Sequence, residues 1–274
     1  MTGDKLPTVL HIWNLTGGSS LIAKYYGKLY GGRAEVIARR KFDRFRFTEF
    51  YGGTTYGDGA LYFYIRAALK SRKFDIIQIH SLDRLVPPLR TIYGSKPIIL
   101  QYHGHDILNR WKEKQNRWEV ADFISYSTPD MASADMPERA RYIKDMIDTD
   151  IFRPGNVERM PATAFTFSYN MDGEAHELAK KMGVALTIAK RFSIPMDEMA
   201  NVFSKYEYFF DLRKRTGQPK PIECLGTAAF QAQACGCKAV DWKGDIHTGF
   251  PEGHDPASVM SIWMGIYGEL SERG

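Results

Sequence analysis

The chain has 274 residues, of which 44% are hydrophobic, and its formal net charge is +5. This is enough apolar material for one large or two modest domain cores, and no apolar run approaches the roughly 18 residues that a membrane-spanning helix needs. The positive charge would suit phosphorylated ligands or an anionic membrane surface but does not indicate nucleic acid. The polar N-terminal segment lacks the apolar stretch of a secretory signal, so we expect a cytoplasmic protein.

Short β-rich segments alternate with helical patterns along the chain. In the first half we predict strands at Thr8–Trp13, Ala34–Ala38, Asp75–His80, Pro97–Tyr102, Asp122–Tyr126 and Tyr142–Ile147, and helices at 19–30, 59–71, 83–92, 107–117 and 130–139. A shorter second series has predicted strands at Ala164–Tyr169, Leu186–Ala189, Tyr208–Asp211 and Lys238–Trp242. Apolar strands separated by helices indicate parallel sheets covered on both faces. The sequence therefore predicts an α/β protein of two doubly wound halves, which bind ligands beyond the carboxyl ends of their strands.

The residues that follow or end three strands of the first half are candidates for ligand binding. Gly17 and Gly18 follow the first strand, where paired glycines allow close backbone approach and a helix start can hold an anion or a sugar hydroxyl. His80 and His103 end two later strands. A strand-end histidine can be purely structural, and His103 with His105 could instead bind a metal, but two such strand ends at the expected ligand-binding edge favour a functional role.

The junction between the halves is marked by a turn. The strand predicted to end at Ile147 is followed by Asp148, which can hydrogen-bond its own backbone, and Pro154 stops any continuation. Phe152 is expected to fill the gap beside the strand end. We place the linker at Arg153–Pro161.

The segment from Pro221 to Asp241 is the most informative in the chain. Glu223 and Gln231 are eight residues apart, so on one helix they would project from the same face, with Glu223 in the first turn. Gly236 would stop that helix. The three cysteines, Cys224, Cys235 and Cys237, are clustered here and are expected to be reduced, small buried side chains. A plain helix after a buried strand is the alternative interpretation.

These motifs resemble family 4 glycosyltransferases, which are retaining enzymes of the GT-B fold. The segments that carry the resemblance are 142–154 and 195–241, and weaker similarity extends from the first loop onward. The resemblance implies a Rossmann-like acceptor-side domain at 1–156, a reduced nucleotide-sugar-binding domain at 157–254 and a C-terminal helix at 255–274 that packs back on the first domain. It implies catalytic roles for Glu223 and His103, with donor-binding residues Gly17, Gly18, Gln231, Lys190, Arg191, Leu225, Gly226 and Thr227.

Two departures from the family pattern bear on activity. The family motif has two glutamates separated by seven residues. Glu223 matches the first, but Gln231 stands at the position of the second. An amide accepts hydrogen bonds from hydroxyls more weakly than a carboxylate. In the family, an Arg and a Lys early in the second domain neutralise the diphosphate of the donor. The corresponding strand of this chain has no basic residue. Lys190 and Arg191, or the cluster Arg213–Arg215, could replace the missing pair. A weak or inactive nucleotide- or glycan-binding protein, or a partner of an active transferase, is therefore the rival hypothesis.

The predicted function is transfer of a sugar from a nucleotide donor, such as a UDP- or GDP-sugar, to an acceptor with retention of configuration. We expect no cofactor, no bound metal and no nucleic-acid partner; the acceptor could be a glycan, a lipid or a small molecule. A GT-B epimerase or phosphorylase is a third class that no residue favours specifically. The C-terminal segment repeats apolar residues at helical spacing, at Val259, Ile262, Trp263, Ile266 and Tyr267, and a peripheral membrane contact there is the less favoured interpretation.

Overall fold

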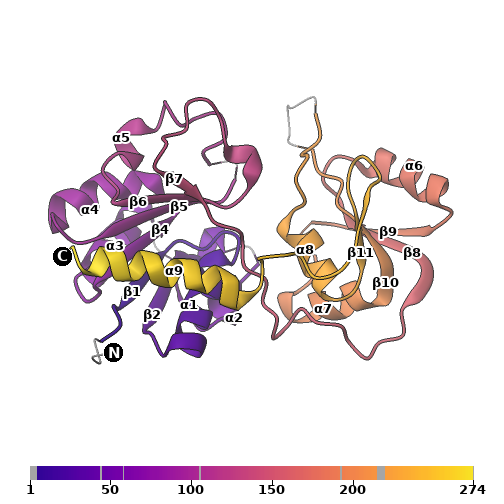
Figure 1. Ribbon diagram of the computed structural model, residues 1–274, viewed down its shortest axis with the longest axis horizontal. Coiled ribbons are helices and arrows are strands. Elements are labelled where there is room, and N and C mark those ends of the chain that lie inside the picture. The colour runs from indigo at the N-terminus through magenta and orange to yellow at the C-terminus, as the bar shows by residue number, and fades with distance from the viewer. Residues whose placement is uncertain are drawn as a thin grey trace. The chain divides into compact units, whose positions relative to one another are not determined.

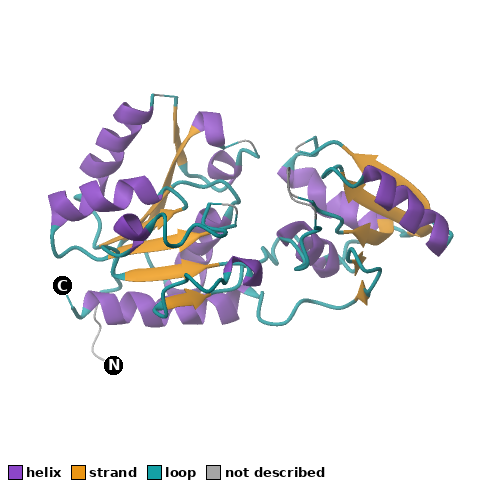
Figure 2. Ribbon diagram, turned by 90° about the horizontal axis from the view of Figure 1, so that it is seen from above, coloured by secondary structure: helices purple, strands orange, loops and turns teal. Residues whose placement is uncertain are grey.

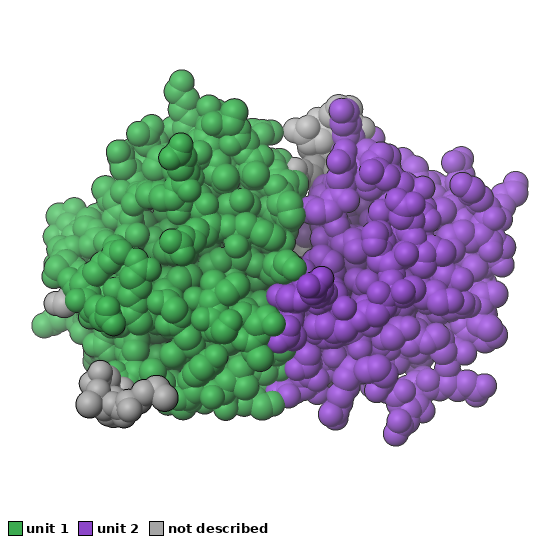
Figure 3. Space-filling model, in the orientation of Figure 1, with its two compact units in different colours: residues 1–146, 256–274 green, residues 147–255 purple. Residues whose placement is uncertain are grey.

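A computed structural model describes residues 5–43, 45–57, 59–104, 106–191, 193–214 and 220–273. The chain forms two compact units (Figure 3). Unit 1 comprises residues 1–146 and 256–274, and unit 2 comprises residues 147–255. The first unit therefore ends at residue 146, whereas we placed the domain boundary at 156, and the C-terminal helix belongs to unit 1.

Unit 1 is built on a seven-stranded parallel sheet in the order β3-β2-β1-β4-β5-β6-β7. Its first six positions follow the strand order of Rossmann folds, with the order reversing between β1 and β4. The strands are β1 (Val9–Ile12), β2 (Ala34–Arg39), β3 (Thr54–Tyr56), β4 (Ile76–His80), β5 (Ile98–Tyr102), β6 (Phe123–Tyr126) and β7 (Ala140–Tyr142). The helices are α1 (Gly18–Tyr30), α2 (Phe47–Phe50), α3 (Ala60–Ser71), α4 (Val86–Tyr93), α5 (Gln115–Trp118) and α9 (Pro256–Ser271).

Helices cover both faces of this sheet (Figure 2). Side chains of α3 and α4 share one apolar cluster with Leu10 and Ile12, and side chains of α1 and α9 share another with Val9. Alternate residues of a strand point to opposite faces, which explains why neighbours on β1 belong to different clusters. In Figure 1 the helix α9 (yellow) crosses in front of the strands of unit 1.

The apolar face of α9 is buried within unit 1. Val259, Trp263, Ile266 and Tyr267 are at most 4% exposed, whereas Ile262 is 47% exposed and points away from the core. The prediction that this segment is an amphipathic helix is correct apart from Ile262. Because its apolar side is used in packing, α9 does not offer that side to a membrane.

Unit 2 has a five-stranded sheet in the order β12-β11-β10-β8-β9, parallel except for β12. Its strands are β8 (Met160–Phe167), β9 (Ala185–Ala189), β10 (Tyr206–Phe210), β11 (Lys238–Val240) and β12 (Ile246–His247). Its helices are α6 (Asp172–Met182), α7 (Met196–Lys205) and α8 (Thr227–Ala234). The chain first runs from β8 to β9 on one side and then crosses to β10 on the other, so the order of this sheet reverses between β8 and β10.

Three predicted elements of the first half are wrong. The predicted helix at 107–117 is a series of turns before α5, in which the Trp111 indole is buried and donates to the Met131 carbonyl oxygen at 2.8 Å. The predicted helix at 130–139 is only a short 3₁₀ turn at Pro129–Met131. The predicted strand at Tyr142–Ile147 ends at Tyr142, and the Ile147 amide bonds instead to the carbonyl oxygen of His254, on the returning chain.

The turn that follows is as predicted. Asp148 Oδ1 accepts a hydrogen bond from the Asp150 amide at 3.1 Å, and Phe152 is 1% exposed beside Phe203. No helix in the described part of the chain has the length and apolar character needed to cross a membrane.

Candidate functional site

The carboxyl ends of β1, β4 and β5 lie side by side in unit 1 and share an unusual backbone conformation. Trp13 follows β1 with φ 81°, Ser81 follows β4 with φ 63°, and Gly104 lies two residues beyond β5 with φ 142°. Two of the three are not glycine, and left-handed backbone at such residues costs of the order of 1–3 kcal/mol each. Strain of this kind gathers at functional sites, and here it lies where the strand order reverses.

The loop after β1 is held by a buried asparagine. Ser19 Oγ donates to Asn14 Oδ1 at 2.5 Å, and Asn14 Nδ2 donates to Ser20 Oγ at 2.7 Å and to Thr48 Oγ1 at 3.1 Å. Asn14 is 3% exposed, so this buried network holds the start of α1 in place. Asn14 was not selected from the sequence, where it lies three residues before Gly17.

The two glycines of the loop are needed for different reasons. Gly17 caps α1 with φ 83°, a left-handed conformation that residues with a side chain rarely adopt. At Gly18 a β-carbon would lie 3.0 Å from Cε1 of His103. The structure therefore brings Gly17, Gly18 and His103 together, and the missing side chain at Gly18 makes room for the imidazole.

His103 is the outer member of a chain of three histidines. His11 Nδ1 lies 3.0 Å from His80 Nε2, and His80 Nδ1 lies 2.9 Å from His103 Nε2. At the outer end, His103 Nδ1 is 3.6 Å from Asp145 Oδ1. His11 and His80 are at most 1% exposed. The sequence pointed to His80 and His103 but missed His11 and Asp145.

The carboxylate fixes the direction of this chain. Each neutral imidazole has one N–H, so the two hydrogen bonds must run the same way. With the N–H on Nδ1 of every ring, His11 donates to His80, His80 donates to His103, and His103 turns its own N–H toward Asp145. With the opposite tautomers, which carry the N–H on Nε2 of every ring, an unprotonated Nδ1 of His103 would point toward the carboxylate of Asp145. We assign the first set, in which His103 is a hydrogen-bond donor at Nδ1 and its Nε2 is already occupied.

Burial keeps the inner two rings neutral. Burial lowers the pKa of His11 to about 3. Burial, together with the neighbouring His103 and His11, holds the pKa of His80 well below its usual value. A positive charge is disfavoured on an imidazole that water cannot reach. The inner histidines therefore act as fixed dipoles that orient His103.

In unit 2 the predicted helix at Glu223 starts later than expected. The helix α8 begins at Thr227, and Gly226 caps it with extended backbone, at φ −95° and ψ 169°. Glu223 is exposed in the preceding loop, so it does not share a helix face with Gln231, which lies inside α8. The predicted stop at Gly236 is correct: the helix ends at Ala234 and Gly236 has φ 82°.

An ion pair that the sequence did not reveal causes the late start. Asp211 Oδ2 accepts the Gly226 amide at 2.7 Å, while Asp211 Oδ1 accepts Arg213 Nε at 2.6 Å. Arg213 also donates to the carbonyl oxygen of Cys224. A β-carbon at Gly226 would meet the Arg213 guanidinium at 2.6 Å. The pair thus holds the loop that carries Glu223 and Leu225 against the end of β10.

The basic candidates of unit 2 differ in how they are used. Arg213 is bound to Asp211, and although burial opposes its charge, the carboxylate outweighs that effect and raises the pKa of the guanidinium. Lys190 and Arg191 follow β9 as predicted, and the Arg191 guanidinium lies 4.8 Å from the ring centre of Tyr169, beyond β8. Arg215 lies outside the described residues. Arg191 is therefore a described cation that lies at the strand ends, held against Tyr169.

The three cysteines are free thiols, as predicted. Cys235 and Cys237 are buried, and burial raises the pKa of the first to about 11 and of the second to about 12. Cys224 is partly exposed. Neither buried thiol carries a nucleophilic thiolate near neutral pH. Within the described residues no group of three or more His, Cys, Asp or Glu could hold a metal ion, and His105, the other half of the predicted metal pair, lies outside them.

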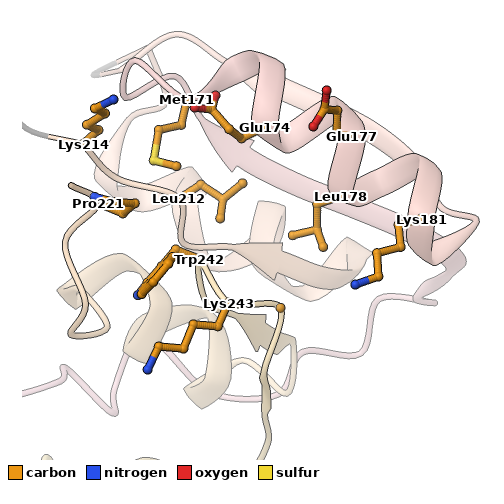
Figure 4. A pocket seen from close by; sticks show the side chains of 11 residues that line it. Met171, Glu174, Glu177, Leu178, Lys181, Leu212, Lys214, Pro221, Trp242 and Lys243 are labelled. Atoms are coloured by element: carbon orange, nitrogen blue, oxygen red, sulfur yellow. The ribbon is translucent and has the colours of Figure 1, made fainter. Parts of the chain in front are cut away.

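Unit 2 also contains a cavity of about 470 Å³ between α6 and the turns that follow β10 and β11 (Figure 4). Its walls combine apolar side chains, three lysines and two glutamates: Met171, Glu174, Glu177, Leu178, Lys181, Leu212, Lys214, Pro221, Trp242 and Lys243. The volume is typical of small-molecule sites. Lys214, from the predicted basic cluster Arg213–Arg215, lines it, but none of the other predicted donor-binding residues does, and it meets the Glu223 loop only at Pro221.

Comparison with known proteins supports the fold and leaves the family open. No protein-family model and no curated protein matches the chain. Among solved structures, Anabaena Alr3699/HepE in complex with UDP has a TM-score of 0.54 at 12% identity, covering 97% of this chain and 95% of that one. UDP-GlcNAc 2-epimerase from Neisseria meningitidis, bound to UDP-GlcNAc, has a TM-score of 0.53 at 9% identity, with coverages of 97% and 94%. The predicted fold class, GT-B with two Rossmann-like α/β domains, is confirmed.

Proposed function

We propose that this protein binds a nucleotide-sugar in unit 2 and transfers the sugar to an acceptor with retention of configuration. The observation that carries the proposal is the loop before α8. Asp211 and Arg213 hold its backbone, so Glu223 stands exposed beside the start of a helix that has no side-chain cap. Helix starts bind phosphate, and an exposed carboxylate can accept hydrogen bonds from sugar hydroxyls.

The predicted residues of unit 2 other than Gln231 have roles that fit their positions. Glu223 would bind the donor sugar, and the backbone of Leu225, Gly226 and Thr227 would approach the diphosphate. Arg191, held on Tyr169, would neutralise phosphate charge together with Lys190. The solved structures with similar folds were obtained with UDP and with UDP-GlcNAc, which supports a uridine nucleotide as the first ligand to test.

In unit 1, His103 would contact the sugar. Its Nε2 is occupied by His80, which leaves it unsuited to accept a proton there during catalysis. Its N–H at Nδ1 is buried and faces Asp145, so any contact that His103 makes with the sugar would come from its ring carbon Cε1 beside Gly18. The acceptor class, whether glycan, lipid or small molecule, stays a prediction, as does the absence of a cofactor.

A binding protein without turnover is the rival function. Two observations favour it: Gln231 stands where the family motif has an acid, and Arg213, one of the possible substitutes for the missing basic pair, is bound to Asp211. Such a protein would still bind nucleotide at the α8 loop. The two hypotheses therefore differ in turnover and agree on binding.

Thermal unfolding in the presence of UDP, GDP, ADP and their common sugar conjugates tests the proposal. A ligand at 100 times its Kd should stabilise the folded state by about 2.7 kcal/mol. Glu223→Ala should weaken binding of the sugar conjugate but not of the nucleotide alone. Glu198→Ala, which removes another exposed glutamate of unit 2, is the matched control. Lack of stabilisation by every nucleotide would reject the donor site. Binding without measurable release of nucleotide from its sugar conjugate, with any acceptor offered, would favour the rival.

A further inference from the structure

The outward face of α3 is apolar, although this helix lies on the surface of unit 1. Leu61, Tyr62, Ile65 and Leu69 are 69%, 67%, 47% and 58% exposed. At 100° per residue these four side chains lie within one stripe of the helix surface. The opposite side, with Phe63 and Ala67, is fully buried in the core. A helix that is apolar on both sides is normally covered on both sides.

Only positive charge surrounds the stripe on the helix itself. Residues 60–71 contain no acidic side chain. Arg66, whose guanidinium lies 5.3 Å from the ring centre of Tyr56, is exposed, and Arg72 and Lys73 are exposed just beyond the helix end. Lys70 turns the other way and pairs with Glu35 at 2.7 Å. The neighbouring helix α4 is attached at the side of α3, where the Tyr93 hydroxyl donates to the Ala68 carbonyl oxygen. It does not cover the stripe.

We propose that the outward face of α3 is a docking surface for an anionic membrane. Leucine and isoleucine side chains would enter the boundary between headgroups and acyl chains, tyrosine is favoured at that depth, and the three cations would meet acidic headgroups. The peripheral contact left open by the sequence is thus assigned to α3 and not to α9, whose apolar side is buried in unit 1.

Charge and size favour a membrane over a second copy of the chain. In a symmetric dimer the same face meets itself, so the cations of the two copies would be brought together. Residues 59–73 carry no acidic side chain to pair with them, and Asp58 lies outside the described residues. Four side chains on one helix also expose only a few hundred Å² of apolar surface, less than the roughly 800 Å² per partner of a standard interface.

The test is flotation of the full-length protein with vesicles of phosphatidylcholine, alone or with about one third phosphatidylglycerol. Each cation near an anionic surface contributes roughly fivefold to partitioning, so three should give about a hundredfold preference for the anionic vesicles. Ile65→Glu should reduce partitioning at least tenfold. Ile262→Glu is a matched control, because both isoleucines are 47% exposed on helices of unit 1. Unchanged thermal unfolding confirms that both variants fold.

Partitioning lost with Ile65→Glu and kept with Ile262→Glu supports the proposal. No binding to either vesicle, equal binding to both, or equal loss in the two variants overturns it. Light scattering that shows a dimer, converted to monomer by Ile65→Glu, would also overturn it in favour of self-association. No nucleotide is needed, so the result is independent of the proposed function.

Discussion

Acidification tests the histidine chain through His11. In the unfolded chain this imidazole has its ordinary pKa of 6.5, whereas burial lowers its pKa in the folded protein to about 3. Below pH 6.5 the unfolded state therefore binds a proton that the folded state does not, so stability is complete above that pH and falls as the pH decreases. Because the folded pKa is far below 5, His11 alone should cost about 2 kcal/mol between pH 7.5 and pH 5. His80 adds a contribution of the same sign.

The variant His11→Asn isolates this effect. The asparagine amide can occupy the place of Nδ1 and keep the bond to His80, but it does not titrate. It leaves space where the ring was, so we expect a constant loss of stability at every pH. The loss between pH 7.5 and pH 5 should nevertheless be about 2 kcal/mol smaller than in the natural protein.

Urea unfolding followed by tryptophan fluorescence is the appropriate assay. Four of the five tryptophans, Trp13, Trp111, Trp118 and Trp263, belong to unit 1, which contains the histidine chain. His176→Gln, which removes an exposed histidine, is the control and should leave the pH dependence unchanged. If His11→Asn loses as much stability on acidification as the natural protein, the buried neutral histidine is not the cause and our account of the chain is wrong.

Three further substitutions probe other contacts. Asp211→Ala should lower the free energy of unfolding by about 2–4 kcal/mol, because it leaves the Arg213 guanidinium, whose side chain is only 20% exposed, without its partner. Calorimetry should show this as a Tm of unit 2 that is lower by a few degrees. A loss below about 1 kcal/mol would contradict the role of the pair. Gly18→Ala should displace the His103 ring, shift its signal in two-dimensional NMR spectra and lower the free energy of unfolding by about 1–3 kcal/mol. An unshifted signal would show that the loop backbone moves and the His103 ring does not. Tyr267→Phe removes a buried hydrogen bond to a β4 glutamine and should cost about 1–3 kcal/mol in urea unfolding; no loss would mean that water replaces the hydroxyl.

Most of the strands, and the helices α1, α3 and α4, could be predicted because their patterns are local, whereas the edge strands β3, β7 and β12 were not predicted correctly. Buried parallel strands are short apolar runs, and the glycine stop at Gly236 follows from backbone sterics. The start of α8 could not be predicted in this way. Its cap at Gly226 is fixed by Asp211, 15 residues earlier in the chain, so Glu223 was assigned to a helix that does not include it.

The histidine chain shows a similar division. His80 and His103 were selected because they end strands, but His11 lies within β1 and reads as an isolated polar residue in an apolar run. The available signal was periodicity across strands: β4 places Gln78 and His80 on the face to which His11 belongs, and Gln101 on β5 bonds to Gln78 at 3.0 Å. Polar residues at alternating positions on adjacent strands form a buried row, and only the strand order shows which residues are neighbours.

The helix α9 makes unit 1 discontinuous, and this affects how the protein is synthesised. Residues 256–274 complete a unit whose other residues end at 146, and all of unit 2 is encoded between them. During translation the sheet of unit 1 emerges first with one apolar flank bare, including the place where Tyr26 will meet Tyr267 at 5.3 Å between ring centres. Unit 1 therefore reaches its complete fold only after α9 has been made, when all of unit 2 has already been synthesised.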